Sequence, residues 1–528
     1  MIQDLLPPAK LDDPKLGRFE KARGSSKKYS SGSHPSSCHS YQAPIGIPVL
    51  FGPSHKVLGQ AQALLAFNWN GSIFAHLATI FGLALGLLLI AQILRSPRSP
   101  AASIGWILAI ILIPFLGIPL FLFLGTRKLK KIQATKTVLH LPQWKKAHIK
   151  DQAIHNLLQS LHVPFATSGN TVSIHKNGKE ALSDLLGILQ QAKESIDLEV
   201  FILGNDGTGK KILEILTKKA EHGIRVRLLL DSVGSFLFDK NALKKLEASG
   251  GKVAWFIPVF HRPFKGRANL RNHRKVLIVD GLLAWTGGRN LADEYFMGAK
   301  GEESWVDFSF SLQGQSVLIY QSIFDSDWSF ATETTPSHTK TQTRNPGTGE
   351  SLVQVLASGP DVPEDPLYEA LLLSCFDAKK RILIVTPYFV PDETFFQALK
   401  LASLRGVSVD LVMPKNSNHR IADVARERFL RSLAGVGAKI RLLPDRMIHA
   451  KAIVIDDRYA LSGSANLDIR SLFLNFEAMS IFYSKKDVLK IQSWIEGIWE
   501  KGQPFQAVKA NAFQEMKEGL VLLMAYQL

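Results

Sequence analysis

The same eight-residue pattern occurs twice in this chain of 528 residues. The first copy, HRKVLIVD, begins at His273, and the second copy, HAKAIVID, begins at His449, 176 residues later. In both copies a Lys follows the His by two positions, an apolar run comes next, and an Asp ends the pattern. Two copies of one pattern indicate two copies of one structural unit, so we expect two related units in the fold.

The spacing of His and Lys places them on one face of the chain. Side chains alternate between the two faces of an extended strand, so positions i and i+2 project from the same side. His273 and Lys275 are therefore expected to face one small volume, and His449 and Lys451 are expected to face a second. A charged ammonium in that place can hold an anion beside the imidazole.

An Asn follows the His by 17 residues in both copies: Asn290 in TGGRN and Asn466 in SGSAN. Such a set suits a phosphodiester exchange. A neutral His can attack phosphorus, a second His can protonate the departing alcohol, and Lys and Asn can hold the non-bridging oxygens. Since one copy supplies only one His, we expect the two copies to meet across a pseudo-twofold axis at one divided phosphate site.

The repeated pattern resembles the two His-x-Lys-x4-Asp motifs of the phospholipase D superfamily. Three longer phrases, NLRNHRKVLIVDG, TPYFVPDE and SANLDIRSLFLNFE, resemble the bacterial cardiolipin synthase branch and stand in that family's order, over about residues 73 to 500. The resemblance implies that one phosphatidylglycerol gives its phosphatidyl group to a His, with release of glycerol, and that a second phosphatidylglycerol then accepts it. It favours His273 as the nucleophile and His449 as general acid and then base.

The resemblance also counts the motif aspartates, Asp280 and Asp456, among the catalytic residues. Their spacing argues for a different role. Each Asp stands seven residues from its His, and seven residues of extended strand span about 23 Å. We therefore expect these carboxylates to hold turns or to pair with backbone.

Two other carboxylates are candidates for orienting the histidines. A catalytic imidazole needs an acceptor at its second ring nitrogen. Asp307, in SWVDF, follows His273 by 34 residues, and Glu477, in LNFEA, follows His449 by 28. We expect each carboxylate to support the His of its own copy. The alternative is an ordinary charge at a strand end.

Two apolar stretches predict a membrane hairpin. The stretch 73–94 has 22 residues and the stretch 101–126 has 26 residues, and neither contains Lys, Arg, Asp or Glu. About 20 such residues span a hydrocarbon core, so both are predicted to be transmembrane helices, the second kinked at Pro114 and Pro119. The alternative is a buried hairpin of a soluble protein.

Charge predicts the orientation and the partner. Four basic residues closely follow the second stretch and two lie in the connector, so the positive-inside tendency places the remainder of the chain in the cytoplasm, as part of a multi-pass protein of the inner (cytoplasmic) membrane. The net charge of +17 suggests an anionic partner, either lipid headgroups or nucleic acid. The hairpin favours phosphatidylglycerol and the anionic bilayer, and no nucleic acid is expected.

Strands and helices alternate twice after the hairpin, which predicts an α/β fold with two phospholipase D-like mixed-sheet domains. A Ser-rich, basic start of the chain predicts a disordered tail, or a true start of translation further downstream. The role of the apolar end of the chain stays open. The predicted parts are a tail (1–70), a membrane region (71–126, with helices 73–94 and 101–126), a first domain (150–331), a linker (332–350), a second domain (351–505) and a C-terminal segment (506–528).

Several other functions remain as alternatives. Water in place of the acceptor alcohol would give a phospholipase D, another alcohol a different phospholipid, and a nuclease or a non-catalytic scaffold is less expected. The turn 204–210, GNDGTGK, resembles a phosphate-binding loop, but Lys211 stands where Ser or Thr would bind magnesium, so no nucleotide is expected. The motifs contain His and Lys rather than a carboxylate cluster, so no metal and no cofactor are expected.

Overall fold

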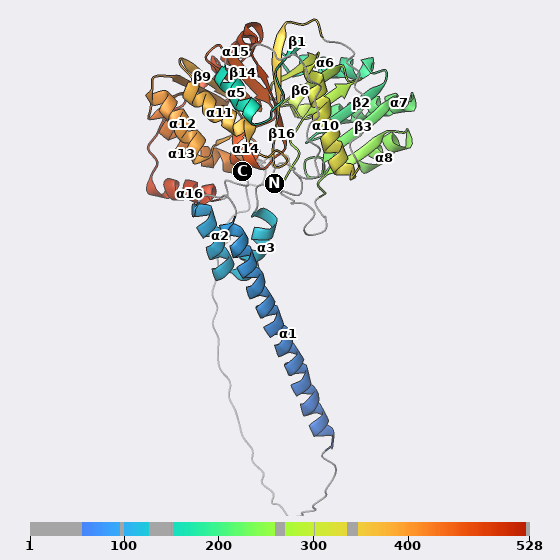
Figure 1. The fold of residues 1–528 in the computed structure, drawn as a ribbon, viewed down its shortest axis with the longest axis vertical. Helices are drawn as coiled ribbons and strands as arrows, with labels where there is room; N and C mark the ends of the chain where they lie inside the picture. The colour runs from blue at the N-terminus through green and yellow to red at the C-terminus, as the bar shows by residue number, and fades with distance from the viewer. Residues whose placement is uncertain are drawn as a thin grey trace, which may run out of the picture. The chain divides into compact units, whose positions relative to one another are not determined.

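A computed structural model describes residues 55–95, 100–125, 149, 152–258, 270–299, 301, 303–334 and 347–523. The described residues belong to two compact units, a helical unit that ends at Gly125 and an α/β unit that follows it. Figure 1 shows both units, and each is described by itself. Most of the predicted tail, residues 1–54, lies outside the described residues.

The helical unit contains α1 (His55–Leu94), α2 (Pro100–Leu112) and α3 (Pro114–Leu124). Within the described residues, one helical stretch is long and apolar enough to cross a membrane, Ile73–Leu94. The kink predicted at Pro114 is a break between two helices, so the stretch 101–126 does not form a single kinked helix. The chain leaves the helical conformation at Ile113, with φ −135° and ψ 63°, because proline disfavours a helical residue before it and cannot donate a backbone hydrogen bond.

The helical unit begins earlier than predicted, and its two short helices pack closely. Helix α1 begins at His55, so residues 55–70 are not part of a tail; they are rich in Ala, Leu and Gln, which favour helix. Helices α2 and α3 pack closely at Gly117, where a Cβ atom would lie 2.2 Å from the Ala109 carbonyl oxygen. Only glycine permits this approach.

The α/β unit is built on one 15-stranded mixed sheet. Figure 1 shows its first half in green to yellow beside its second half in orange to red. The first half comprises α5 (Gln152–Ser160), β1 (Thr167–Ile174), α6 (Gly178–Gln191), β2 (Ser195–Val200), α7 (Gly207–Glu221), β3 (Arg225–Asp231), α8 (Lys240–Ala248), β4 (Lys252–Phe256), β5 (Val276–Val279), β6 (Leu283–Gly287), α9 (Asp293–Phe296), β7 (Ser309–Gln313) and α10 (Ser316–Thr332).

The second half follows the predicted linker. It comprises β8 (Ser351–Ser358), α11 (Pro366–Asp377), β9 (Arg381–Val385), β10 (Phe389–Val390), α12 (Glu393–Leu404), β11 (Ser408–Pro414), α13 (Arg420–Ala434), β12 (Lys439–Leu443), β13 (Ala452–Ile455), β14 (Tyr459–Gly463), β15 (Leu467–Asp468), α14 (Ile469–Phe473), β16 (Glu477–Phe482), α15 (Lys485–Trp499), β17 (Gln503–Pro504) and α16 (Ala512–Leu522). The predicted alternation of strands and helices is confirmed in both halves.

The strand order repeats outward from the centre of the sheet, where β1 pairs antiparallel with β8. One side reads β1-β7-β6-β5-β2-β3-β4, and the other reads β8-β16-β14-β13-β9-β11-β12, with β17 at the edge. Each strand of one half thus has a counterpart in the other, as a pseudo-twofold relation would require. The two predicted domains are therefore halves of one compact unit that share a single sheet.

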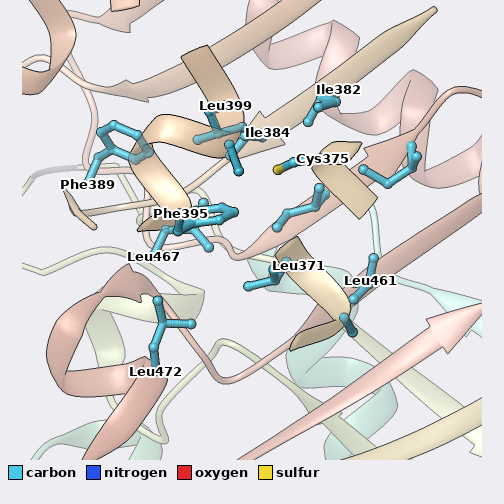
Figure 2. Packing of buried hydrophobic residues seen from close by; sticks show 14 of the residues in the cluster. Leu371, Cys375, Ile382, Ile384, Phe389, Phe395, Leu399, Leu461, Leu467 and Leu472 are labelled. Carbon is cyan, nitrogen blue, oxygen red and sulfur yellow. The ribbon is translucent and has the colours of Figure 1, made fainter. Parts of the chain in front are cut away.

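Apolar side chains hold this sheet between its helices. The motif strands β5 (VLIV) and β13 (AIVI) are buried at every position, as expected for strands covered on both faces. One apolar cluster lies around Leu371, Cys375 and Phe395 of the second half (Figure 2) and includes Ile154 and Leu158, because α5 packs against α11. A second cluster joins the halves and includes Phe310 and Val353. The shared core fixes the position of one half against the other.

Candidate active site

Each motif histidine lies just before its strand, on a segment that the other half holds. The His273 backbone N–H donates to the Phe476 carbonyl at 2.9 Å, and the His449 backbone N–H donates to the Val306 carbonyl at 2.8 Å. Further bonds run back, from the Phe476 N–H to the Arg271 carbonyl at 2.9 Å. The two motif segments are therefore interlocked across the middle of the unit.

The orienting carboxylates are crossed between the halves. His273 Nδ1 lies 3.0 Å from both carboxylate oxygens of Glu477, and His449 Nδ1 lies 2.8 Å from Asp307 Oδ2. The prediction that each carboxylate supports the His of its own copy is wrong. Phe476 and Val306, which each precede a carboxylate by one position, form bridges with the motif segment of the opposite half. That pairing delivers each carboxylate to the opposite histidine.

Electrostatics keep both carboxylates charged and both imidazoles neutral. Burial lowers the pKa of His273, and burial together with the Lys451 ammonium lowers the pKa of His449 to about 3. Although burial alone would raise the pKa of Asp307, the nearby His449 and Lys451 lower it to about 2. The pKa of Glu477 is lowered in the same manner by His273. Each Nδ1–H therefore donates to a carboxylate, which leaves Nε2 as the ring nitrogen without a proton.

Both histidines line one cavity of about 110 Å³, as predicted for a divided site. Asn290 and Asn466 line it as well. Its other lining residues come from both halves: Phe201, Ile202, Val233, Gly234, Arg271, Glu294, Tyr295 and Trp305 from the first, and Tyr388, Asn418, His419, Ala422, Asp468, Arg470, Ser471 and Asn475 from the second. These residues were not predicted from the sequence, because many of them lie far from the motifs along the chain.

The two motif lysines are buried beside the histidines but are not among the described residues that line the cavity. The Lys275 ammonium donates to the His273 carbonyl at 2.7 Å. The Lys451 ammonium lies 2.7 Å from Nδ1 and 3.1 Å from Nε2 of His449. Burial lowers the pKa of Lys451 to about 8 and that of Lys275 well below its usual value. Contact of either lysine with phosphate stays a prediction.

The two asparagines differ in their partners. The Asn290 amide donates to the Tyr295 hydroxyl at 2.8 Å, and its oxygen accepts from the Ile202 N–H at 3.3 Å. The Asn466 Oδ1 is buried without a hydrogen-bond partner within the part of the chain that the structure describes. Of the two motif-related asparagines, Asn466 is thus the one with an unused polar atom among the described residues. Phosphate binding by either one stays a prediction.

The motif aspartates lie at the far ends of their strands, as the spacing argument predicted. The Asp280 carboxylate accepts from the backbone N–H groups of Glu194 and Ser195, both at 2.7 Å. The Asp456 carboxylate accepts from Lys380 and Arg381 in the same way. Both aspartates have φ of 54°. The structure therefore corrects the assignment of Asp280 and Asp456 as catalytic residues, since both hold the turns before β2 and β9.

Replacing Asp456 by Ala is expected to lower the free energy of unfolding by about 2 kcal/mol, because charge-assisted hydrogen bonds to backbone N–H groups are lost. Turnover per folded molecule is expected to change less than about twofold. Thermal unfolding and turnover, measured on one detergent preparation, check both. Asp456→Asn is the matched control, since Asn tolerates positive φ and keeps one acceptor. A large fall in turnover with unchanged unfolding would return Asp456 to the catalytic set.

A buried polar network makes the halves unequal beside their histidines. Arg274 Nε donates to the Glu477 carbonyl at 3.1 Å, and its NH1 contacts Asp327 Oδ2 at 2.5 Å. Asn272 Nδ2 donates to Glu199 Oε2 at 3.3 Å. Burial, followed by the nearby Asp327, raises the pKa of Glu199 well above its usual value. The network therefore lies directly under the His273 segment and its carboxylate.

The second half has apolar residues in the corresponding places. Asn272 and Arg274 flank His273, and the residues that flank His449 in the same way are Ile448 and Ala450. Glu199 pairs with the first residue of β5, and Val385 pairs with the first residue of β13. The sequence carried one signal of this difference, a Glu near the end of the strand SIDLEV, which is buried at every position. A buried Glu in such a strand requires a partner.

The phosphate-loop-like turn has its amides occupied by side chains of the protein. Asp206 caps α7 by accepting from the Gly209 N–H at 3.0 Å. Asp293 accepts from the Thr208 N–H at 2.8 Å and from the Gly207 N–H at 3.2 Å. A carboxylate thus lies where a nucleotide phosphate would bind the helix N-terminus, which favours the interpretation of this segment as a structural turn.

The mirrored sheet order and the two histidines in one cavity define a phospholipase D-like site. Comparison with known proteins agrees. The family model described as "Cardiolipin synthase, PLD-like domain" matches residues 185–328 and 373–499, and one described as "Phospholipase_D-nuclease N-terminal" matches residues 84–125. The chain belongs to the cardiolipin synthase family of the phospholipase D superfamily, a family of phospholipid phosphatidyltransferases.

Relatives support this assignment over most of the chain. The chain is 31% identical to cardiolipin synthase 1 of Bacillus cereus, over 79% of this chain and 86% of the relative. It is 33% identical to the major cardiolipin synthase ClsA of Bacillus subtilis, over 78% of this chain and 90% of the relative. A solved structure of phosphatidylserine synthase from Haemophilus influenzae matches 71% of this chain and 97% of its own, with a TM-score of 0.54 and 16% identity. That likeness supports the fold.

Proposed function

We propose that this membrane-associated protein makes cardiolipin and glycerol from two molecules of phosphatidylglycerol. The observation that carries the proposal is one cavity lined by two histidines, each held at Nδ1 by a carboxylate of the opposite half. Such a site offers a nucleophile and a separate proton carrier to one phosphorus atom. Relatives named cardiolipin synthase support cardiolipin as the product.

The proposed reaction has two steps. In the first, His273 Nε2 attacks phosphorus, the bond from phosphorus to the glycerol oxygen breaks, and His449 gives that oxygen a proton. In the second, His449 removes the proton from a hydroxyl of the second phosphatidylglycerol, that oxygen attacks phosphorus, and the phosphorus–nitrogen bond breaks. Because burial and the Lys451 ammonium lower the pKa of His449 to about 3, the negative charge of the phosphodiester must favour protonation of His449 before the first step.

His273 is proposed as the nucleophile because the halves are unequal. Both lysine ammonium groups donate to the carbonyl of their own histidine, and Lys451 also contacts the His449 imidazole, whereas His273 Nε2 stays open to the cavity. The Lys451 ammonium lies 3.1 Å from His449 Nε2, where it can occupy the lone pair that an attack requires. The Arg274 network braces only the carbonyl of Glu477, the carboxylate partner of His273. Both differences favour attack by His273.

We further propose a location in the cytoplasmic membrane, as a multi-pass protein, with the α/β unit facing the cytoplasm. The apolar stretch Ile73–Leu94 supports membrane insertion. The basic residues that follow Gly125 in the sequence support the orientation. Accessibility of an introduced surface cysteine to an impermeant thiol reagent, in whole cells and in inverted vesicles, tests the side.

The product formed from phosphatidylglycerol alone tests the proposed function. Purified full-length protein in vesicles of phosphatidylglycerol is expected to form cardiolipin and glycerol in equal amounts. Phosphatidic acid with glycerol would instead indicate a phospholipase D. Absence of any product, with turnover only when serine or another alcohol is added, would indicate a different phosphatidyltransferase and would overturn the proposal.

The pH dependence of turnover follows from the shifted pKa values. His273 must be neutral to attack, and burial lowers its pKa, so the acid limb of kcat/KM is expected below the usual histidine value of about 6.5. Lys451 has a pKa of about 8, so the positive charge beside the phosphate is lost above that value and turnover falls. Lys451→Gln is expected to be weakly active and to lack the alkaline limb. If turnover of Lys451→Gln still fell at the same alkaline pH, the fall could not come from deprotonation of Lys451.

A further inference from the structure

Helix α16 presents an apolar face away from the protein. Phe513, Met516, Leu520 and Leu523 stand at i, i+3, i+7 and i+10, which places them on one side of a helix. Phe513 is 71% exposed and Leu523 is 81% exposed. A helix that packs on a soluble core normally buries such a face, so α16 has the reverse arrangement.

The inner face of α16 is attached through a charged pair. Glu518 is 1% exposed, and its carboxylate accepts two hydrogen bonds from the Arg431 guanidinium of α13, one of them at 3.0 Å. This bidentate pair fixes the rotation of α16 about its own axis. The outward direction of the apolar face is therefore set by the fold.

Helix α13 connects α16 to the candidate active site. His419 and Ala422, at its N-terminal end, line the cavity. Ala422 precedes Arg431 by nine residues, which corresponds to about 14 Å along a helix. The apolar face of α16 thus lies within a short distance of the cavity, on the side of the second half.

The first half places exposed apolar residues beside the same cavity. Val233 and Gly234 line it, and Phe236 and Leu237, two positions further on, are exposed. The Lys240 ammonium lies 6.0 Å from the Phe236 ring. Apolar side chains with nearby cations are typical of segments that rest in the interface of an anionic membrane.

We propose that Phe236 and Leu237, together with Phe513, Met516 and Leu520 of α16 and the C-cap residue Leu523, form a docking surface for an anionic lipid bilayer. Exposed Lys509 and Lys517 near this face favour anionic lipids. The surface holds the cavity at the headgroup level, so that a headgroup reaches the histidines while its acyl chains stay in the bilayer. This last step rests on the proposed function; the docking itself does not.

Fluorescent labels at single cysteines test the docking. Leu520→Cys and Phe236→Cys are made in full-length protein with Cys38→Ser, since Cys375 is buried and burial raises its pKa to about 12. An environment-sensitive dye is attached in vesicles of phosphatidylglycerol and phosphatidylethanolamine. Both labels are expected to shift to the blue and to be quenched by nitroxide-bearing lipids.

Leu489→Cys is the matched control, since Leu489 is an exposed leucine of α15. Figure 1 shows α15 and α16 at opposite edges of the α/β unit. Its label is expected to be quenched by aqueous iodide and not by lipid nitroxides. Labels at 236 and 520 that behave like the control would overturn the proposal, as would labels shielded from both quenchers, which would indicate a protein partner or a second copy.

Turnover gives a second readout. Phe513→Ser with Leu520→Ser is expected to reduce turnover of long-chain phosphatidylglycerol in vesicles by roughly fivefold or more, and to leave turnover of a water-soluble, short-chain phosphatidylglycerol within about twofold. Leu489→Ser is expected to change neither. An equal loss on both substrates would overturn the docking role. If the unsubstituted protein makes no cardiolipin, the proposed function fails while lipid quenching of the labels still supports docking.

Discussion

Replacing His273 or His449 by Asn is expected to reduce formation of cardiolipin by at least about 10⁴-fold, because each variant removes a group that forms or breaks bonds at phosphorus. Both side chains line the cavity, and each is held by a different carboxylate, so neither histidine can take over the role of the other. Conversion of radiolabelled phosphatidylglycerol in vesicles measures the loss. His222→Asn, at the exposed end of α7, is the control and is expected to keep full turnover.

A substrate with a good leaving group separates the two histidines. Departure of nitrophenolate needs no proton, so release of nitrophenol from a phosphatidyl nitrophenol is expected to survive in His449→Asn and to be lost in His273→Asn. Normal turnover of phosphatidylglycerol in either variant would contradict a two-histidine reaction. If nitrophenol release survived only in His273→Asn, His449 would be the nucleophile and His273 the acid.

Glu477→Gln and Asp307→Asn are each expected to lower kcat by about 10² to 10⁴-fold, because an amide can hold the imidazole in the wrong tautomer and cannot stabilise its positive charge. The crossed contacts predict which step each variant damages. Glu477 holds the proposed nucleophile, and Asp307 holds the proposed acid. The loss in Glu477→Gln is therefore expected to persist with the nitrophenol substrate, and the loss in Asp307→Asn is expected to shrink.

The matched variant for this comparison is Ser464→Ala. The Ser464 hydroxyl donates to Glu477 Oε2 at 2.5 Å, so its removal is expected to cause a smaller loss with the same pattern as Glu477→Gln. The opposite assignment, in which Asp307→Asn shows the persistent loss, would contradict the crossed arrangement of histidines and carboxylates. Equal losses with both substrates in both variants would show that the carboxylates support the fold rather than separate steps.

The repeated spacing in the sequence was enough to predict the main parts of the site. His273 and His449 line one cavity, and Asn290 and Asn466 line it with them. The strand geometry also predicted that the motif aspartates bind backbone. Periodicity and alternation predicted the α/β halves, because buried strands such as VLIV and AIVI have a local signature.

Contacts between distant segments were beyond sequence reasoning. The exchange of Glu477 and Asp307 between the histidines depends on bridges such as Asn272 to Phe476, which join residues 204 positions apart. Spacing along the chain carries no information about such pairing. The Arg274 network was missed for the same reason. Pro114 gave a local signal for the kink, but the signal did not show that the chain would leave the helical conformation at Ile113 and begin a new helix.

The residue that carries the phosphatidyl group tests the central claim most directly. Full-length protein is mixed with radiolabelled phosphatidylglycerol, denatured within one turnover, digested, and the labelled peptide is identified by mass spectrometry. The divided site with unequal halves predicts a phosphorus–nitrogen adduct on His273 and none on His449. An adduct on His449, or cardiolipin formation without an adduct on either histidine, would contradict it.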